Sequence, residues 1–363
     1  MDAYDRGVLT DAVFFDFSKA FDRVPHGPLL HKLQAYGIDR VLCQWIEAFL
    51  TGRSFRVRIG SHLSDPSPVT SGVPQGSVLG PILFLIYVND LPDHLEVNSL
   101  FYADDLKIWS SDAVSLQRDI DKVKQWSIDW SLPLNETKCA HVSFGGPSGN
   151  NFYLQDGGPA LTNADKVKDL GVWFSSNLSF SHHHEMSVRK AWAVLGMIRR
   201  SFPRITIVDF KLLYGTYVRP LLEYCSSVTH TGLVKDANLL ERVQRKATKL
   251  VVGLKNLPYE ERLVRLQLYP LQTRSLRGDI LLTHHLFSSG LNLALFPPNT
   301  STYCRGHERK IFKRRPRTFL RQHSFSFRVV EPWNNLPREA ALATDKRSLK
   351  AAVDVHLGLI SQL

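Results

Sequence analysis

Two adjacent carboxylates interrupt the apolar stretch FYADDLKIW, residues 101–109. The flanks of this stretch predict two strands joined by a tight turn. Because neighbouring side chains of a strand point to opposite faces, Asp104 and Asp105 reach one site only if the turn brings them to the same end of a hairpin. Two like charges held there are costly unless a cation compensates, and a hard divalent ion such as magnesium suits carboxylate oxygens. Asp-Asp is equally compatible with ordinary turn chemistry, so the rest of the chain has to decide.

The composition indicates a globular chain that favours polyanions. The 363 residues are enough for two or three domains, and 44% hydrophobic with 22% charged residues is ordinary for a folded protein. The formal net charge of +11 favours nucleic acid or an anionic membrane as partner. The longest apolar run, residues 78–88, is too short to span a bilayer. Nucleic acid is therefore the expected partner, and no membrane association is expected.

Cysteine usage and the N-terminus indicate an intracellular protein. The acidic start MDAYD is not a signal peptide. The cysteines are widely scattered, so they predict neither a metal site nor a disulfide framework. Unpaired cysteines are expected in a reducing compartment, which is the nucleus or the cytoplasm. The four cysteines are Cys43, Cys139, Cys225 and Cys304.

A third carboxylate lies near the N-terminus. Residues 12–17, AVFFDF, form a β-type apolar run that contains Asp16. An acid embedded in a buried strand is costly and needs a partner. Asp16 is therefore interpreted either as a turn residue at the end of a strand or as a member, with Asp104 and Asp105, of one metal-binding group.

A glycine-rich loop, SGVPQGSVLGP at residues 71–81, precedes an apolar helix expected at 82–91. Glycines at this density allow a backbone to approach a ligand closely, and Pro81 suits the first turn of a helix. Gln75 is the only long polar side chain of the loop. The alternative is a plain loop before a core helix. The intervening pattern predicts helices at 25–38 and 41–49 and a strand with a basic outer face at 55–59.

The second half of the chain reads as mostly helical from Met186 onward. Before it, the pattern predicts a helix at 116–126, a strand at 139–144 and a small hairpin from residues 169–174 and 178–180. The tract His182-His183-His184 is interpreted as solvated or packed, because consecutive residues cannot easily face one ion. A basic run with interleaved aromatics at residues 303–321 either binds nucleic acid or acts as a localisation signal.

The order of Asp16, residues 72–76, Asp104-Asp105 and Lys138 resembles motifs A, B, C and D of a polymerase palm. The chain resembles a reverse transcriptase of the non-LTR (LINE-type) retrotransposon family, close in texture to Jockey/CR1-like elements, firmly over residues 10 to 265. The passages that carry the resemblance are FDFSKAFDRVPH at 15–26, the loop at 71–81 with LFLIYVNDL at 83–91, YADD at 102–105, and DLGV at 169–172. The last passage looks like motif E, the primer grip.

The resemblance implies a chemistry and a role for each residue. Two divalent ions, Mg²⁺ or Mn²⁺, would activate the primer 3′-hydroxyl and stabilise the leaving pyrophosphate. The implied metal ligands are Asp16 and Asp104, with Asp105 assisting, and Lys138 is the candidate general acid. The implied nucleotide-binding residues are Phe17, Phe21, Gln75 and Gly76, with Phe21 at the position of the steric gate that favours dNTPs, and the implied primer-binding residues are Leu170 and Gly171.

The resemblance also implies an α+β fold in three parts. A right-hand palm, with an antiparallel sheet backed by helices, is expected at residues 1–150. A primer-grip hairpin and helical thumb follow at 151–265, and a basic region of unknown role at 266–363. The expected partners are an RNA template, a DNA primer, dNTPs and the upstream part of a retrotransposon polyprotein.

The start of the chain departs from the family pattern. Residues 1–11 offer only Arg6 as a cation and cannot replace the fingers region that precedes motif A in the family. The upstream endonuclease is also missing, so a truncated palm and thumb is expected. Two alternatives to a reverse transcriptase remain. One is a catalytically inactive remnant that binds nucleic acid. The other is an RNA-dependent RNA polymerase, which the aromatic Phe21 disfavours.

Overall fold

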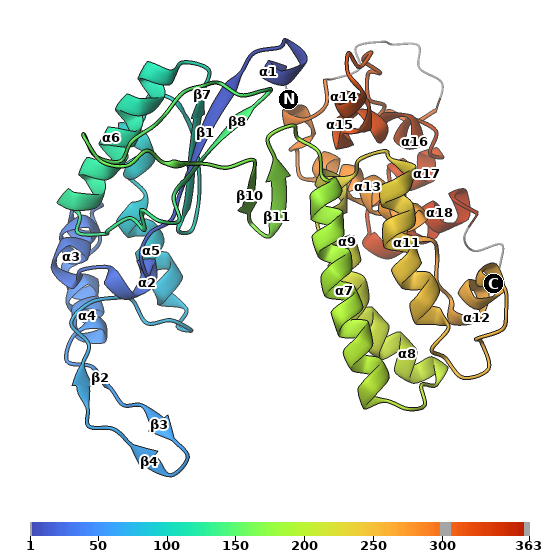
Figure 1. Ribbon diagram of the computed structural model, residues 1–363, viewed down its shortest axis with the longest axis horizontal. Helices are drawn as coiled ribbons and strands as arrows, with labels where there is room; N and C mark the ends of the chain where they lie inside the picture. Colours follow the sequence, from blue (N-terminus) through green and yellow to red (C-terminus); the bar gives the residue numbers. More distant parts are fainter. Residues whose placement is uncertain (1, 298–305, 359–363) are drawn as a thin grey trace. The chain divides into compact units, whose positions relative to one another are not determined.

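The computed structural model describes residues 2–297 and 306–358 and divides into two compact units (Figure 1). The first unit is Asp2–Asp169 and the second is Leu170–Leu363. Each unit has a hydrophobic core of its own. The fold is therefore mixed, with the main sheet in the first unit and mostly helices in the second.

A five-stranded sheet organises the first unit, in the order β6-β7-β1-β8-β9. β1 pairs antiparallel with both β7 and β8, and β8 pairs parallel with β9. As the central strand, β1 is built from the nearly continuous apolar run that a strand covered on both faces requires. The bounds are β1 (Thr10–Phe15), β6 (Asn98–Tyr102), β7 (Asp105–Ser110), β8 (Ala140–Phe144) and β9 (Thr162–Asn163).

The predicted helices of the first unit are present and pack against the sheet. They are α3 (His26–Ala35), α4 (Arg40–Leu50), α5 (Leu79–Val88) and α6 (Ala113–Asp129). Their apolar faces share one core with the central strands. Asp39 and Asp112 accept backbone N–H bonds at the starts of α4 and α6, which fixes where these two helices begin. Shorter elements are α1 (Asp2–Asp5), α2 (Ala20–Arg23) and the 3₁₀ turn η1 (Leu91–His94).

Lys32 is a buried cation that ties α3 to α5 and α6. Its ammonium donates to the Tyr87 carbonyl at 2.6 Å and to the Asp90 carboxylate at 2.5 Å. It also lies 3.6 Å from the ring centroid of Trp130 and 4.9 Å from that of Trp126. Aromatic faces and one carboxylate together replace the water that this charge loses.

The expected strand at 55–59 is wrong in extent. The structure has four two-residue strands there, which form an arm that extends away from the sheet (Figure 1). β2 (Ser54–Phe55) pairs with β5 (Ser67–Pro68), and β3 (Arg58–Ile59) pairs with β4 (His62–Leu63). Every residue of these strands is exposed, so the alternation of apolar and basic residues does not reflect a buried face.

Long helices dominate the second unit, as the sequence predicts. The longest are α7 (Ser181–Ser201), α11 (Val234–Thr248) and α13 (Leu271–Ser288). The remaining elements are α8 (Ile207–Leu213), the π-helix η2 (Tyr214–Val218), α9 (Arg219–Glu223), α10 (Ser226–Thr229), α12 (Tyr259–Leu266), η3 (Asn292–Ala294), α14 (Phe319–His323), α15 (Phe325–Arg328), α16 (Val330–Asn334), α17 (Arg338–Ala341) and α18 (Lys346–His356). None of the helices in the described ranges is long and apolar enough to cross a membrane.

The boundaries of the structure differ from those predicted. The expected boundary at residue 150 lies inside the first unit, because Phe152, Leu154 and Leu161 belong to its core. The expected boundary at residue 265 lies inside the second unit, where α13 contributes Leu271 to one apolar cluster and Ile280 to another.

The hairpin expected from residues 169–174 and 178–180 is also displaced. The strands are β10 (Lys166–Asp169) and β11 (Val172–Ser175), and residues 178–180 lead into α7 without forming a strand. Leu170 and Gly171 both have positive φ, so the chain turns between the two strands within the segment predicted to be extended.

Asp11 is the centre of a buried polar network on β1. Its carboxylate accepts bonds from His141 at 2.9 Å, Ser143 at 2.5 Å and Asn150 at 2.8 Å. Burial alone would raise the pKa of this carboxyl, but these donors, with Ser148, hold the pKa well below its usual range. The network therefore ties β1 to β8 and to the segment that follows β8.

We expect Asp11→Ala to destabilise the first unit by about 3 kcal/mol, because buried donors lose their acceptor. The folded-state pKa of Asp11 is depressed. The wild type should therefore hold this stability above the unfolded pKa of about 4 and lose it as the pH falls towards the folded pKa. Urea titrations read by hydrogen exchange of β1 and β8 peptides measure the first unit alone. The exposed Asp156→Ala is the control, and equal effects of both changes would contradict the assignment.

Candidate active site

The register between β1 and β7 places two of the predicted aspartates together. Phe15 at the end of β1 pairs with Leu106, the second residue of β7. One step further along the same ladder lie Asp16, immediately after β1, and Asp105, the first residue of β7. Asp16 lies at the end of the strand, as one of the two interpretations had it, and 36% of its side chain is exposed. Ending the strand at Phe15 keeps the charge in contact with water.

The Asp-Asp stretch forms the predicted strand, tight turn and strand. Tyr102 pairs with Asp105, so Ala103 and Asp104 make a two-residue turn. Ala103 has a φ of +53°, which a turn of this length requires and which an alanine adopts only at some cost. The turn brings both carboxylates to the same end of the β6–β7 hairpin.

A cavity of about 350 Å³ opens at this end of the sheet. Asp16, Asp105 and Lys138 line it, whereas Asp104 does not. The ammonium of Lys138 lies 3.4 Å from a carboxylate oxygen of Asp16. Lys138 is thus beside the predicted aspartates. The other polar lining residues are Lys107, Lys166, Lys168 and Asp169.

The carboxylates of this cavity repel one another. Partial burial, then the neighbouring carboxylates of Asp104 and Asp169, raise the pKa of Asp105, while Lys107 opposes the shift. Lys107 is itself bonded to Asp169, and both side chains are largely buried. A cation in the cavity would relieve this repulsion and lower the cost of ionising Asp105.

Sequence reasoning missed the ion pair between Lys107 and Asp169. A signal for Lys107 was present, because it lies two residues after Asp105 and therefore on the same face of β7. Asp169 was quoted only as the start of the primer-grip passage. Nothing in the sequence pairs it with β7, since 62 positions separate it from Lys107.

The donor set fits a hard divalent ion in its chemistry, because Asp16, Asp104 and Asp105 offer only oxygen ligands. The geometry is less complete. Within residues 2–297 and 306–358, no three His, Cys, Asp or Glu side chains lie close enough to hold one ion. Binding an ion here would therefore require these side chains to move towards one another.

The glycine-rich loop is anchored on the turn that follows Asp16. The Gly72 N–H donates to the Val24 carbonyl at 2.8 Å, and the Val73 N–H donates to the Phe21 carbonyl at 2.8 Å. A Cβ on Gly72, whose φ is +89°, would lie 2.7 Å from the Asp22 carbonyl oxygen. The loop is therefore a docked element in which glycine is required, and not a plain connection.

The loop brings Gln75 and Phe21 to the same turn. The exposed Gln75 amide donates to the Asp22 carboxylate at 2.8 Å. The Phe21 ring stacks on Phe84 of α5, with 4.4 Å between centroids, and is only partly buried. Asp22 is a further residue that sequence reasoning did not single out as functional, although it lies within the motif A passage.

Other predicted site residues are not among those that line the cavity. Phe17 is 3% exposed and packs against Phe101 and Trp126, so its ring is not available to a nucleotide. Gly76 is exposed on the glycine-rich loop and does not line the cavity. Leu170 and Gly171 belong to the second unit, where the Tyr224 hydroxyl donates to the Leu170 carbonyl at 2.8 Å.

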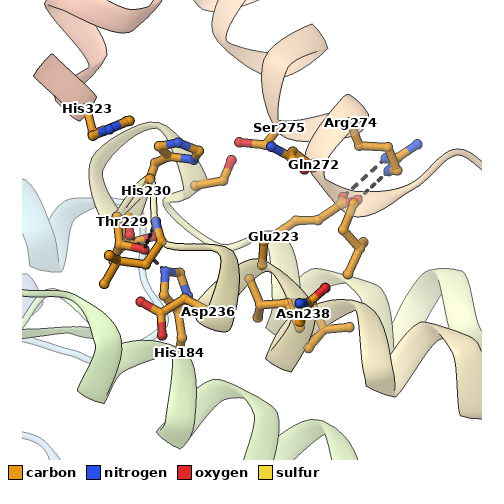
Figure 2. Close-up of a pocket in the computed structure, with 18 of the residues that line it drawn as sticks. His184, Glu223, Thr229, His230, Asp236, Asn238, Gln272, Arg274, Ser275 and His323 are labelled. Atoms are coloured by element: carbon orange, nitrogen blue, oxygen red, sulfur yellow. Dashed lines mark hydrogen bonds and ion pairs between the residues drawn. The ribbon is translucent and has the colours of Figure 1, made fainter.

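The second unit contains a cavity of about 420 Å³ whose charges are mostly paired (Figure 2). Arg274 is bonded to Glu223, and His184 bonds the Thr229 carbonyl at 2.9 Å. Burial, followed by the nearby charge of Arg328, lowers the pKa of His230 to about 4, so this ring is neutral at neutral pH. His183 and His184 are both buried, which agrees with the packed one of the two interpretations given for the tract, whereas His182 is only half-buried.

Comparison with known proteins finds similarity mainly over the first unit. Residues 7–174 match the family described as reverse transcriptase (RNA-dependent DNA polymerase). The RNA-directed DNA polymerase from mobile element jockey of Drosophila melanogaster is 26% identical over 270 residues, which cover 70% of this chain and 29% of that protein. The probable RNA-directed DNA polymerase from transposon X-element of the same species is 28% identical over 269 residues, covering 69% of this chain and 29% of that protein.

The predicted resemblance to non-LTR reverse transcriptases is confirmed by these relatives. This chain spans about 29% of their length. Among solved structures, apo telomerase from Candida tropicalis aligns over 73% of this chain and 47% of its own, with 11% identity and a TM-score of 0.39. A similarity that low does not bear on the site.

We expect Gly72→Ala to release the glycine-rich loop, because its Cβ would meet the Asp22 backbone. Gly76→Ala is the matched control, since Gly76 has a similar φ of +83° but open space around it. The control should cost about 1 kcal/mol of backbone strain, and Gly72→Ala should cost clearly more. Hydrogen exchange of peptides covering residues 71–78 measures the difference. Similar exchange in both variants would show that the close approach does not matter.

Proposed function

We propose that this chain, whose residues 7–174 carry a reverse transcriptase domain, is the polymerase part of an RNA-directed DNA polymerase from a non-LTR retrotransposon. The observation that carries the proposal is the meeting of Asp16, Asp105 and Lys138 in one cavity at the end of the sheet, beside Asp104. The first unit would act as the right-hand palm. The helices of the second unit would act as the thumb, and a basic region would follow them in the sequence.

The substrates we propose are an RNA template, a DNA primer and dNTPs. Asp16, Asp104 and Asp105 would hold the magnesium ions. When bound, such ions activate the primer hydroxyl and stabilise the leaving pyrophosphate. Burial, then the carboxylates of Asp104 and Asp169, raise the pKa of Asp105, which supports this role because a bound cation would offset these causes.

Lys138 and the glycine-rich loop complete the proposed site. The ammonium of Lys138, beside Asp16, is a proton donor within reach of the cavity where pyrophosphate would leave. Gln75, held against Asp22, would position the template base and incoming nucleotide. Phe21, held in its orientation by stacking on Phe84, would exclude a 2′-hydroxyl. These groups act mainly by positioning the reactants.

A second candidate function is a nucleic-acid-binding protein that keeps the fold without polymerising. The net charge of +11 supports the binding of nucleic acid, and such binding requires no catalysis. The open arrangement of the three aspartates, which form no ion-binding group in the part of the chain that the structure describes, also favours this candidate.

Primer extension on an RNA template with dNTPs and Mg²⁺ separates the two functions. The polymerase predicts extension by the wild type and its loss, by about a hundredfold or more, in the Asp104→Asn, Asp105→Asn double variant. The exposed pair Asp156→Asn, Asp165→Asn changes the charge equally and should retain activity. No extension by any of them, with salt-sensitive RNA binding retained, would favour the binding protein.

Phe21→Val tests the proposed selection of deoxynucleotides. The smaller side chain should admit the 2′-hydroxyl and raise the ratio of rNTP to dNTP incorporation by about tenfold or more. The ratio is the readout because the lost stacking on Phe84 would slow both reactions. Leu30→Val, a change of another half-buried residue against the same core, serves as the packing control. If Phe21→Val left the ratio of rNTP to dNTP incorporation unchanged, Phe21 would not be the steric gate.

A further inference from the structure

A short basic segment, FKRRPR at residues 312–317, crosses the surface of the second unit without forming a helix or strand. All six residues are exposed. The sequence pattern singled out this region, and the proposed polymerase chemistry does not use it. Tyr303, Cys304 and Arg305, which precede it, lie outside the described residues.

The fold holds this segment at both ends. The Ile311 side chain is buried at 2% exposure, and its backbone N–H and carbonyl both bond the Asn334 amide at 2.8 Å. At the other end, the Thr318 hydroxyl accepts the Arg321 N–H at 3.2 Å, where α14 begins. The segment therefore presents its side chains from a defined position on the unit.

Three guanidinium groups on the segment are uncompensated. Lys313 pairs with Glu331 at 2.8 Å. In contrast, Arg314, Arg315 and Arg317 form no hydrogen bond or ion pair with any residue of the described ranges. Closely spaced, exposed arginines without carboxylate partners are suited to the oxygens of a phosphate backbone.

Arg314, the first of these arginines, lines a cavity of about 300 Å³. Its lining combines aromatic, proline and polar side chains. A nucleobase suits such a lining, because its flat face can stack on aromatic rings. Two further charged lining residues are already paired: the Arg328 guanidinium with Asp279 at 2.8 Å, and the Glu331 carboxylate with Lys313 at 2.8 Å. The lining residues that matter here are Phe312, Arg314, Pro316, Gln322 and Phe327.

We propose that this site binds single-stranded nucleic acid. The phosphates lie along Arg314, Arg315 and Arg317, and one unstacked base enters the cavity against Phe312 and Phe327. A base must leave its stack to enter, which selects single strands over duplexes. An import receptor would instead need a free peptide, whereas this segment is held at both ends and shares its side chains with a cavity. The site belongs to the second unit and does not rest on polymerase activity.

Fluorescence anisotropy of the full chain with a labelled oligouridine, over a range of salt concentrations, tests the proposal. The Arg314→Gln, Arg315→Gln, Arg317→Gln variant should bind at least about tenfold more weakly, with a salt slope smaller by about 2. The matched control, Lys346→Gln, Arg347→Gln, Lys350→Gln on α18, removes the same charge from an exposed helical face of the same unit and should change affinity less than about twofold. If both triple variants lost affinity equally, binding would be due to general electrostatic attraction, and the proposed site would be refuted.

Phe312→Ala separates stacking from charge. It should weaken binding about tenfold while the salt slope stays unchanged. Photocrosslinking with 4-thiouridine, mapped by mass spectrometry, should label residues 312–327, and a base-paired oligonucleotide should not. Binding and crosslinking that persist in the triple arginine variant, together with loss of nuclear import receptor binding, would make the segment a localisation signal and refute the proposal.

Discussion

The pairing of β1 with β7 is the constraint on which the first unit depends. β1 is the middle strand, and its antiparallel register with β7 makes Phe15 face Leu106. A shift of one residue would change the partner of every residue of β1 along this ladder. The same register decides that Asp16 and Asp105 meet where both strands end at the cavity. Core packing and site geometry are therefore set by one ladder of hydrogen bonds.

The unit treats its carboxylates in two opposite ways. Asp11, at the start of β1, is buried and fully supplied with donors, which depress its pKa. At the other end of the strand, Asp16 and Asp105 are partly exposed, and partial burial, then the carboxylates of Asp104 and Asp169, raise the pKa of Asp105. The first arrangement stabilises the sheet. In the second arrangement, the carboxylates near Asp105 repel one another, and a bound cation can relieve this repulsion. Such an arrangement is typical of a functional site, whereas a core satisfies its charges.

The second unit shows that histidines and arginines are not by themselves signs of a site. Around the cavity of Figure 2, burial keeps His230 neutral and Glu223 compensates Arg274. By contrast, Arg314, Arg315 and Arg317 remain uncompensated by the residues that the structure describes. The difference between these groups is the presence of a partner, which composition does not reveal.

The sequence by itself determined most local elements and the resemblance to a family. The hairpin at Asp104-Asp105 and the helices with 3.6-residue periodicity follow from short-range preferences. The docking of the glycine-rich loop on Phe21 and Val24 does not, because these residues lie far from the loop in sequence. The order of the motifs carried the resemblance to reverse transcriptases before any geometry was known. Periodicity failed at residues 55–59, because alternation there reflects an exposed arm and not a buried face.

Only the tertiary structure decided which side chains meet. In it, Asp16 lies at the exposed end of β1 and Phe17 is buried in the core. Lys107 pairs with Asp169, which is 62 positions away in the sequence. The tertiary structure also carried the first unit past residue 150, since Phe152 and Leu161 complete its core. These outcomes depend on contacts between distant segments, and the free energy of such contacts is not encoded in any local pattern.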